Sequence, residues 1–216
     1  MESLQAQLNE RRDTSRTKRS PEVLAIMDEA TNAIADLPQN SLQVNQPAPD
    51  FTLPNLKGES VTLSSLLKKN PIVLTFYRGG WCPYCNMQLR AYQAILPEIE
   101  ALGAKLVAVS PQTPDESLST AEKDALSFEV LSDVGNVIAR QYGLVFRLTD
   151  DLRDLYLSMN IDLEHSNGTD AWELPMPGTF IIQQDGTAIH AFVPADYTQR
   201  EEPENILNVL RSIVQG

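Results

Sequence analysis

The chain has 216 residues, of which 42% are hydrophobic and 21% charged, so its composition is that of an ordinary globular protein and excludes wholesale disorder. Its formal net charge of −12 argues against the nucleic-acid phosphate backbone as a main binding partner. No stretch approaches the roughly 18 uninterrupted apolar residues of a membrane-spanning helix, and the opening MESLQAQLNERR lacks the apolar run of a secretory signal. We therefore expect a cytoplasmic protein with neither a nucleic acid nor a membrane as partner.

Residues 1–43 are predicted to form an N-terminal helical extension. Residues 1–20 carry five basic and three acidic side chains and little apolar surface. This predicts a loose basic arm, either solvated or docked on an acidic face of a second copy. From Ser20-Pro21, an N-cap followed by proline, an apolar stripe predicts a helix that is a second-layer element or a homodimer interface. The stripe consists of Val23, Met27, Ala30, Ile34 and Leu37.

Strands and helices alternate from residue 44 onward. Residues 72–77 are a nearly continuous apolar run, which is typical of a central strand covered on both faces. The alternation predicts an α/β domain with helical crossovers and a largely parallel sheet. In chain order its first elements are a hairpin over 48–63, a helical turn at 64–69, strands at 72–77, 105–110 and 128–131, and helices after 82, 113 and 133.

The last third of the chain breaks the alternation before it ends in a hairpin and a helix. Residues 144–174 are acidic, with one helix expected near 150–159, and are interpreted as an insertion. Strands at 179–183 and 188–193 flank Asp185-Gly186, a strong hairpin turn, and a closing helix begins near Pro203. The expected domain therefore covers residues 44–216 and includes the acidic insertion.

Cys82 and Cys85 are the chain's two cysteines, and they form one C-x-x-C motif. A zinc site would need two more ligands, and the chain offers only His165 and His190, far apart in sequence, so we expect no metal and no other cofactor. The motif lies where the central strand ends and a helix begins, which is where open α/β sheets build their sites. Pro83 suits the first helical position, so Cys82 is predicted to be the N-cap.

A thiolate at the N-cap would face unpaired backbone N–H groups and the positive end of the helix dipole. Lowering a thiol pKa from about 8.5 to about 7 raises the thiolate fraction at pH 7 from a few per cent to about half. We therefore predict a redox dithiol with Cys82 as the more exposed sulfur and Cys85 as the resolving partner. Pro177 precedes a strand, either as an ordinary strand start or as a cis proline beside an incoming substrate chain.

Three segments together carry a family resemblance: APDFTL at 48–53, FYRGGWCPYC at 76–85 and PGTF at 177–180. They resemble the thioredoxin fold and, more narrowly, the peroxiredoxin-like branch of the AhpC/TSA family, over about residues 44–214. The resemblance implies a thioredoxin-like mixed sheet flanked by helices, the dithiol at a helix start and Pro177 as the cis proline opposite it. Trp81, Tyr84 and Thr179 belong to these matched motifs and are candidate supporting residues.

The chain also departs from that family. The family's Thr-x-x-Cys motif aligns its threonine with Cys82 and its peroxide-attacking cysteine with Cys85. The N-cap argument instead favours Cys82 as the attacking thiolate. The family's arginine falls at Pro177, and Arg78 is either a substitute cation or a solvated side chain. Thr75 lies approximately where thioredoxins keep a buried acid, so no proton acceptor for Cys85 is visible.

Three functions remain open. A thiol peroxidase would reduce hydrogen peroxide or an organic hydroperoxide and be regenerated by a thiol reductant such as thioredoxin or glutathione. A thiol–disulfide oxidoreductase would use Cys82 to attack a substrate disulfide. A redox-sensing interaction protein would change a partner surface on oxidation. The family resemblance favours the first, and the remaining aromatic and histidine side chains are interpreted as packing or surface residues: Phe146, Tyr156, Trp172, His165 and His190.

Overall fold

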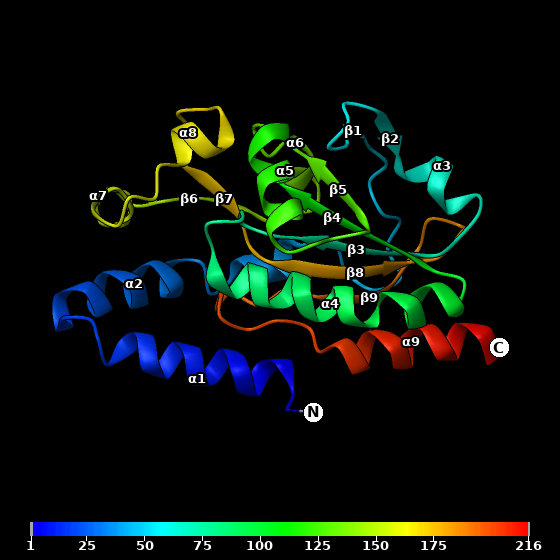
Figure 1. Ribbon diagram of the computed structural model, residues 1–216, viewed down its shortest axis with the longest axis horizontal. Helices are drawn as coiled ribbons and strands as arrows, with labels where there is room; N and C mark the ends of the chain where they lie inside the picture. The colour runs from blue at the N-terminus through cyan, green and yellow to red at the C-terminus, as the bar shows by residue number, and fades with distance from the viewer. Residues whose placement is uncertain (1, 216) are drawn as a thin grey trace.

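A five-stranded mixed sheet forms the centre of the structure, a computed structural model that describes residues 2–215 (Figure 1). The strand order is β5–β4–β3–β8–β9, in which β3, β4 and β5 are parallel and β8 and β9 join antiparallel. The sheet confirms the predicted α/β class. Its strands are β3 (Ile72–Phe76), β4 (Lys105–Ser110), β5 (Glu129–Ser132), β8 (Gly178–Ile182) and β9 (Ala188–Phe192).

The central strand β3 is buried along its whole length. Its side chains alternate between the two faces of the sheet, so Val73 packs in one hydrophobic cluster and Leu74 in the other. Burial on both faces explains the continuous apolar run in the sequence. The parallel neighbours β4 and β5 are reached through the crossover helices α4 (Pro83–Ala101) and α5 (Pro114–Lys123).

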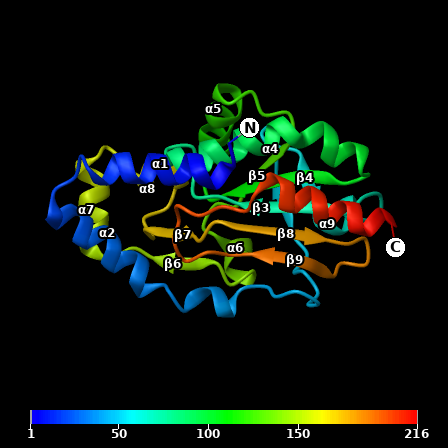
Figure 2. The same cartoon turned by 90° about the horizontal axis from the view of Figure 1, so that it is seen from below.

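Helices cover both faces of the sheet. On one face lie α4, α9 (Pro203–Gln215) and α1 (Leu4–Arg16), which share a core of apolar side chains. The other face is covered by α3 (Leu63–Leu67), α6 (Val137–Gln141) and the antiparallel hairpin of β1 (Thr52–Pro54) and β2 (Ser60–Thr62). Figure 2 shows α9 in front of the sheet and α6 behind it.

The expectation of a loose N-terminal arm is wrong. Helix α1 is ordered, and its Leu4 and Leu8 are buried in the same cluster as α4. The Glu202 carboxylate accepts hydrogen bonds from the backbone N–H groups of Leu4 (3.1 Å) and Gln5 (2.6 Å), which caps the first turn. The local pattern missed this because the capping carboxylate lies 198 residues from Leu4 in the sequence.

The predicted second helix has Ser20 as its N-cap, and the Ser20 hydroxyl accepts a hydrogen bond from the Val23 N–H. This helix, α2 (Pro21–Ala33), ends before the last two residues of the predicted stripe, and a 3₁₀ turn, η1 (Leu37–Asn40), follows. One flank of α2 packs against the acidic region 144–174 (Figures 1 and 2).

Residues 144–174 fold around a small hydrophobic cluster of their own. Trp81, in the turn before the dithiol, also packs against this cluster, so the region reaches the predicted site. Its elements are β6 (Val145–Arg147), α7 (Asp150–Ser158), α8 (Leu163–Asn167) and β7 (Glu173–Pro175), with β6 and β7 antiparallel. Among residues 2–215, no helix combines the length and apolar character needed to cross a membrane.

Candidate active site

The dithiol lies at the start of α4, directly after the carboxyl end of β3. Cys82 is the N-cap and Pro83 the first helical residue, as predicted. The turn before them needs glycine because neighbouring side chains approach its backbone closely. A Cβ on Gly79 would lie 2.4 Å from the Trp81 Nε1, and a Cβ on Gly80 would lie 1.9 Å from the Thr120 hydroxyl.

Both sulfurs are buried in this structure. Cys82 is 2% exposed and Cys85 is fully buried, so Cys82 is the more exposed sulfur, as predicted, but only marginally, and neither sulfur is open to solvent. Both lie in the cluster that includes Tyr84 and the two leucines of α1. The sequence pattern could not show that α1 helps to bury the two sulfurs, because α1 was expected to be a loose arm.

The two thiols differ strongly in acidity, in the opposite sense to the N-cap prediction. Hydrogen bonding to Cys85, together with burial, raises the pKa of Cys82 well above its ordinary value. Burial alone would raise the pKa of Cys85 too, but the hydrogen bond from Cys82 and the charge of Arg200 hold it well below the ordinary value. The Cys82 side chain makes no capping bond to the helix N–H groups. The surroundings therefore favour a thiolate on Cys85 over one on Cys82.

Arg200 is the cation that sequence reasoning missed. Its Nη2 donates to the Cys85 Sγ at 3.4 Å, and the side chain is 3% exposed. The backbone carbonyls of Tyr197 and Gln199 hold its Nη1. Within the described part of the chain it has no carboxylate partner, so its charge is directed to the sulfur. Sequence reasoning missed Arg200 because it lies 115 residues from Cys85 and in no recognisable motif. The one available clue was that Pro177 occupies the position of the family's arginine, which left the site without its expected cation.

Arg78 is a second buried cation, not a solvated side chain. It is 2% exposed, and its Nη2 donates to the Tyr156 hydroxyl. Its Cζ lies 4.5 Å from the ring centroid of Tyr197 and 5.2 Å from that of Trp81, within cation–π range. Its charge and its backbone N–H also help to lower the pKa of Cys85. Tyr156 therefore does more than pack the 144–174 region.

Three buried N–H groups around the dithiol have no acceptor within residues 2–215. They are Arg78 Nε, Arg200 Nε and Trp81 Nε1. Buried donors are normally paired, so such groups often mark a place where a ligand or water is bound. These donors give the site the capacity to hydrogen-bond a small oxygen-containing molecule.

Behind the sulfurs lies a neutral polar network in place of a buried acid. The hydroxyls of Thr75 and Thr179 are 3.1 Å apart, and the Gln88 amide donates to Tyr92 at 3.0 Å. Thr179 thus faces Thr75 across the β3–β8 pair. Beyond it, the buried Glu201 carboxylate bonds His190, a partner that the sequence did not reveal.

Pro177 lies where predicted but not in the predicted conformation. It directly precedes β8, whose first residue, Gly178, pairs with Phe76 at the end of β3. All peptide bonds of residues 2–215 are trans, so the expected cis proline is wrong. An X–Pro bond prefers trans by about 0.5–1 kcal/mol, and residues 176 and 177, between β7 and β8, form no turn that would oppose that preference.

The chain is similar in sequence to several proteins named as peroxiredoxins. The chain is 32% identical over 168 residues to "Peroxiredoxin Q, chloroplastic" of Gentiana triflora, covering 78% of this chain and 64% of that protein. It is 33% identical over 99 residues to the Populus jackii protein of the same name, covering 46% of each chain. It is 30% identical over 105 residues to Peroxiredoxin Bcp of Escherichia coli, covering 49% of this chain and 67% of that one. The match thus spans about half to two thirds of these relatives.

Solved structures share the fold at lower identity. Peroxidoxin BcpB from Mycobacterium tuberculosis is 22% identical, with a TM-score of 0.62 over 80% of this chain and 98% of that one. A putative thiol:disulfide interchange protein DsbE from Chlorobium tepidum is also 22% identical, with a TM-score of 0.56 over 82% and 100%. The thioredoxin-like fold expected from the motifs is therefore confirmed. The AhpC/TSA family profile matches residues 44–191, and the chain belongs to that family.

Proposed function

We propose that the protein is a thiol peroxidase in which Cys85 attacks the peroxide and Cys82 resolves the product. The observation that carries this proposal is the contact of buried Arg200 with the Cys85 sulfur, which together with Arg78 favours a thiolate there. Family membership supports the same chemistry. Cys85 also occupies the peroxidatic position when the family's Thr-x-x-Cys motif is aligned with this chain.

The two cysteines suffice to reduce one peroxide molecule and end as one disulfide. The Cys85 thiolate attacks one peroxide oxygen, the O–O bond breaks, and the other oxygen leaves as water or an alcohol after taking a proton. Cys85 becomes a sulfenic acid. The Cys82 sulfur, one helical turn away, then attacks the Cys85 sulfur, water leaves, and an intramolecular disulfide forms. A thiol reductant such as thioredoxin or glutathione would restore the dithiol.

The surroundings of the sulfurs suit an oxygen leaving group. The unpaired donors on Arg78, Arg200 and Trp81 supply positive charge and hydrogen bonds where negative charge develops in the transition state. A cavity of 20 Å³ reaches Arg78 and Tyr156 from between α2 and α7. A volume of this order holds about one water-sized molecule. Neither cysteine lines this cavity, so it adjoins the site only through Arg78.

The thiol–disulfide oxidoreductase receives less support. That mechanism needs a nucleophilic Cys82 that a substrate disulfide can reach, yet the pKa of Cys82 is raised. Both sulfurs are buried, which excludes a bulky protein disulfide more strongly than a small peroxide. A redox-sensing role would require a partner surface that changes on oxidation. A homodimer through the N-terminal helices and a cytoplasmic location stay predictions.

The test is stopped-flow fluorescence of the pre-reduced protein mixed with hydrogen peroxide. Trp81 adjoins Cys82 and serves as the reporter, and a Trp172→Phe variant leaves it as the single tryptophan. We expect a second-order rate constant far above that of a free thiol with the same pKa. A rate constant no higher than the free-thiol value would overturn the proposal.

A further inference from the structure

Helix α1 contacts the segment that carries the Arg200 cation, and the proposed mechanism gives this helix no role. The backbone N–H of Arg200 donates to the Gln5 Oε1 at 3.2 Å. Further along the same segment, the Glu202 carboxylate caps the first turn of α1. Both α1 and this segment lie outside residues 44–191, which match the family profile. The contact between them is therefore a feature of this chain that the family match does not cover.

The guanidinium of Arg200 is tied to its own loop. Its Nη1 donates to the backbone carbonyls of Tyr197 and Gln199, while its Nη2 donates to the Cys85 Sγ at 3.4 Å. Because the Nη1 bonds stay within residues 197–200, the guanidinium moves together with that segment. The position of the segment thus decides how far the cation lies from the sulfur.

The segment is anchored from two sides. On the side of the domain core, the Tyr92 hydroxyl donates to the Glu201 carbonyl at 3.1 Å, and the Glu201 carboxylate bonds His190. On the side of α1, the anchors are the Gln5 acceptor and the Glu202 cap. A buried N–H that loses its acceptor is costly, so without Gln5 the segment would shift until the Arg200 N–H finds another partner.

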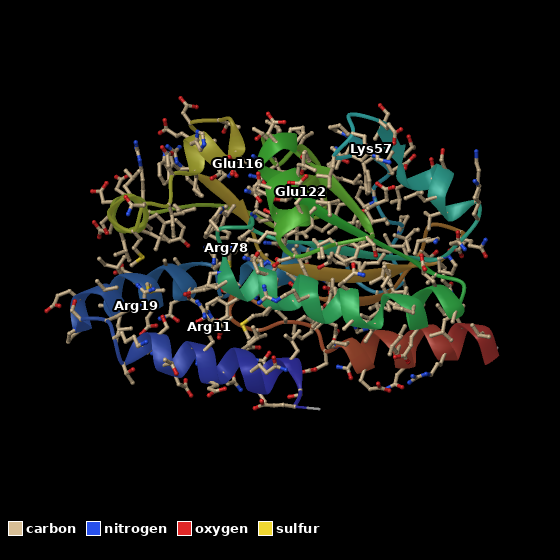
Figure 3. The ribbon with its side chains drawn as sticks, in the orientation of Figure 1. Arg11, Arg19, Lys57, Arg78, Glu116 and Glu122 are labelled. Atoms are coloured by element: carbon tan, nitrogen blue, oxygen red, sulfur yellow. The ribbon has the colours of Figure 1, made fainter. Side chains whose placement is uncertain are left out.

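We propose that Gln5 is a positioning residue: it holds the Arg200 segment so that the guanidinium stays against the Cys85 sulfur, and helix α1 is thereby part of the active site. The inference deepens the proposed function and rests on it. Arg78, the other buried cation beside the dithiol, is held by Tyr156 instead. Figure 3 shows Arg11 and Arg19 in the space between α1 and the layer that contains Arg78. Loss of the Gln5 contact should therefore weaken the action of Arg200 and leave that of Arg78 in place.

The size of the effect follows from Coulomb's law. At an effective dielectric constant of about 20, a retreat of the guanidinium by about 1 Å from its 3.4 Å contact would raise the pKa of Cys85 by about 0.8 unit. Arg78 and Cys82, the other groups that lower this pKa, keep their places. At a pH equal to the native pKa, such a rise would lower the thiolate fraction about 3- to 4-fold.

The test measures the ultraviolet thiolate absorbance of the reduced protein as a function of pH. The variant is Gln5→Met, which keeps an unbranched side chain of similar length but removes the acceptor. Gln7→Met, the same change at an exposed position of the same helix, is the matched control. Both changes are also made in an Arg200→Met background, which completes a double-mutant cycle. The titration contains no peroxide, so failure of the peroxidase proposal would not affect it.

We expect Gln5→Met to raise the pKa of Cys85 by about 0.8 unit and Gln7→Met to leave it unchanged. In the Arg200→Met background, Gln5→Met should cause no further rise, because the cation that Gln5 positions is absent. A role of Gln5 in stability alone would lower the free energy of unfolding without changing this pKa. An unchanged pKa in Gln5→Met, an equal rise in both backgrounds, or an equal rise in Gln7→Met would overturn the proposal.

Discussion

Arg200 provides the sharpest test of how the site makes a thiolate. The Arg200→Met variant removes the charge 3.4 Å from the Cys85 sulfur while keeping an unbranched side chain of similar length. Arg200→Lys keeps the charge but loses the planar fork that the carbonyls of Tyr197 and Gln199 hold. Comparing the two separates the effect of charge from that of geometry.

The expected size follows from the surroundings of the sulfur. An opposite charge within about 4–6 Å lowers a pKa by about 1–3 units, and each unit corresponds to about 1.4 kcal/mol. Losing Arg200 should therefore raise the pKa of Cys85 by about 1–3 units. Arg78 and the Cys82 hydrogen bond remain, so the shift should be partial. At a pH equal to the native pKa, the thiolate fraction and the peroxide rate constant should fall about 5-fold for a rise of one unit and about 50-fold for a rise of two units.

Ultraviolet thiolate absorbance as a function of pH reports the pKa directly, and stopped-flow fluorescence reports the peroxide rate constant. Arg211→Met, at a partly exposed arginine of α9, controls for a general change in net charge. Arg200→Lys should lie between the parent and Arg200→Met. If Arg200→Met leaves both the pKa and the rate constant unchanged, the reasoning about this cation is refuted.

Three further outcomes follow from the same contacts. The pKa of Cys85 is lower in the folded protein than in the unfolded chain, so the Cys85 thiolate stabilises the reduced protein relative to the Cys85→Ser variant. This difference in unfolding free energy should rise with pH between the native pKa of Cys85 and about 8.5, and it should vanish as the pH falls through that native pKa. A difference that does not depend on pH would contradict the prediction. Tyr156→Phe leaves a buried Arg78 N–H without its acceptor and should lower the unfolding free energy by about 1–3 kcal/mol, whereas the exposed Ser158→Ala should not. Leu8→Ala should cost about 2–5 kcal/mol in denaturant unfolding, since Leu8 is fully buried, and a cost as small as that of the exposed Gln7→Ala would show that α1 does not pack.

Local signals predicted the frame of the site well. The apolar run at 72–77 identified the central strand, which ends one residue earlier, at Phe76, and Cys82-Pro83 identified the start of α4. Asp185-Gly186 identified the turn between β8 and β9. Each of these signals depends on neighbouring residues in the sequence, so no knowledge of distant contacts was required.

The chemistry of the site depends on distant contacts, and there the sequence was insufficient. The N-cap argument assigned the thiolate to Cys82 because it considered only the helix dipole. In the structure Arg200, from the segment between β9 and α9, contacts the Cys85 sulfur instead, which favours a thiolate there. Likewise α1 is fixed by Glu202, which no pattern in the first 20 residues could reveal.

The most direct test of the central claim is to identify which sulfur becomes the sulfenic acid. Reduced Cys82→Ser and Cys85→Ser variants are treated with one equivalent of hydrogen peroxide in the presence of dimedone, and the adduct is located by mass spectrometry. Serine at position 82 retains a hydroxyl donor toward Cys85. We predict rapid formation of a dimedone adduct on Cys85 in Cys82→Ser. In Cys85→Ser we predict that an adduct on Cys82 forms no faster than on a free thiol. A rapid adduct on Cys82 in the second variant, with none on Cys85 in the first, would contradict the account.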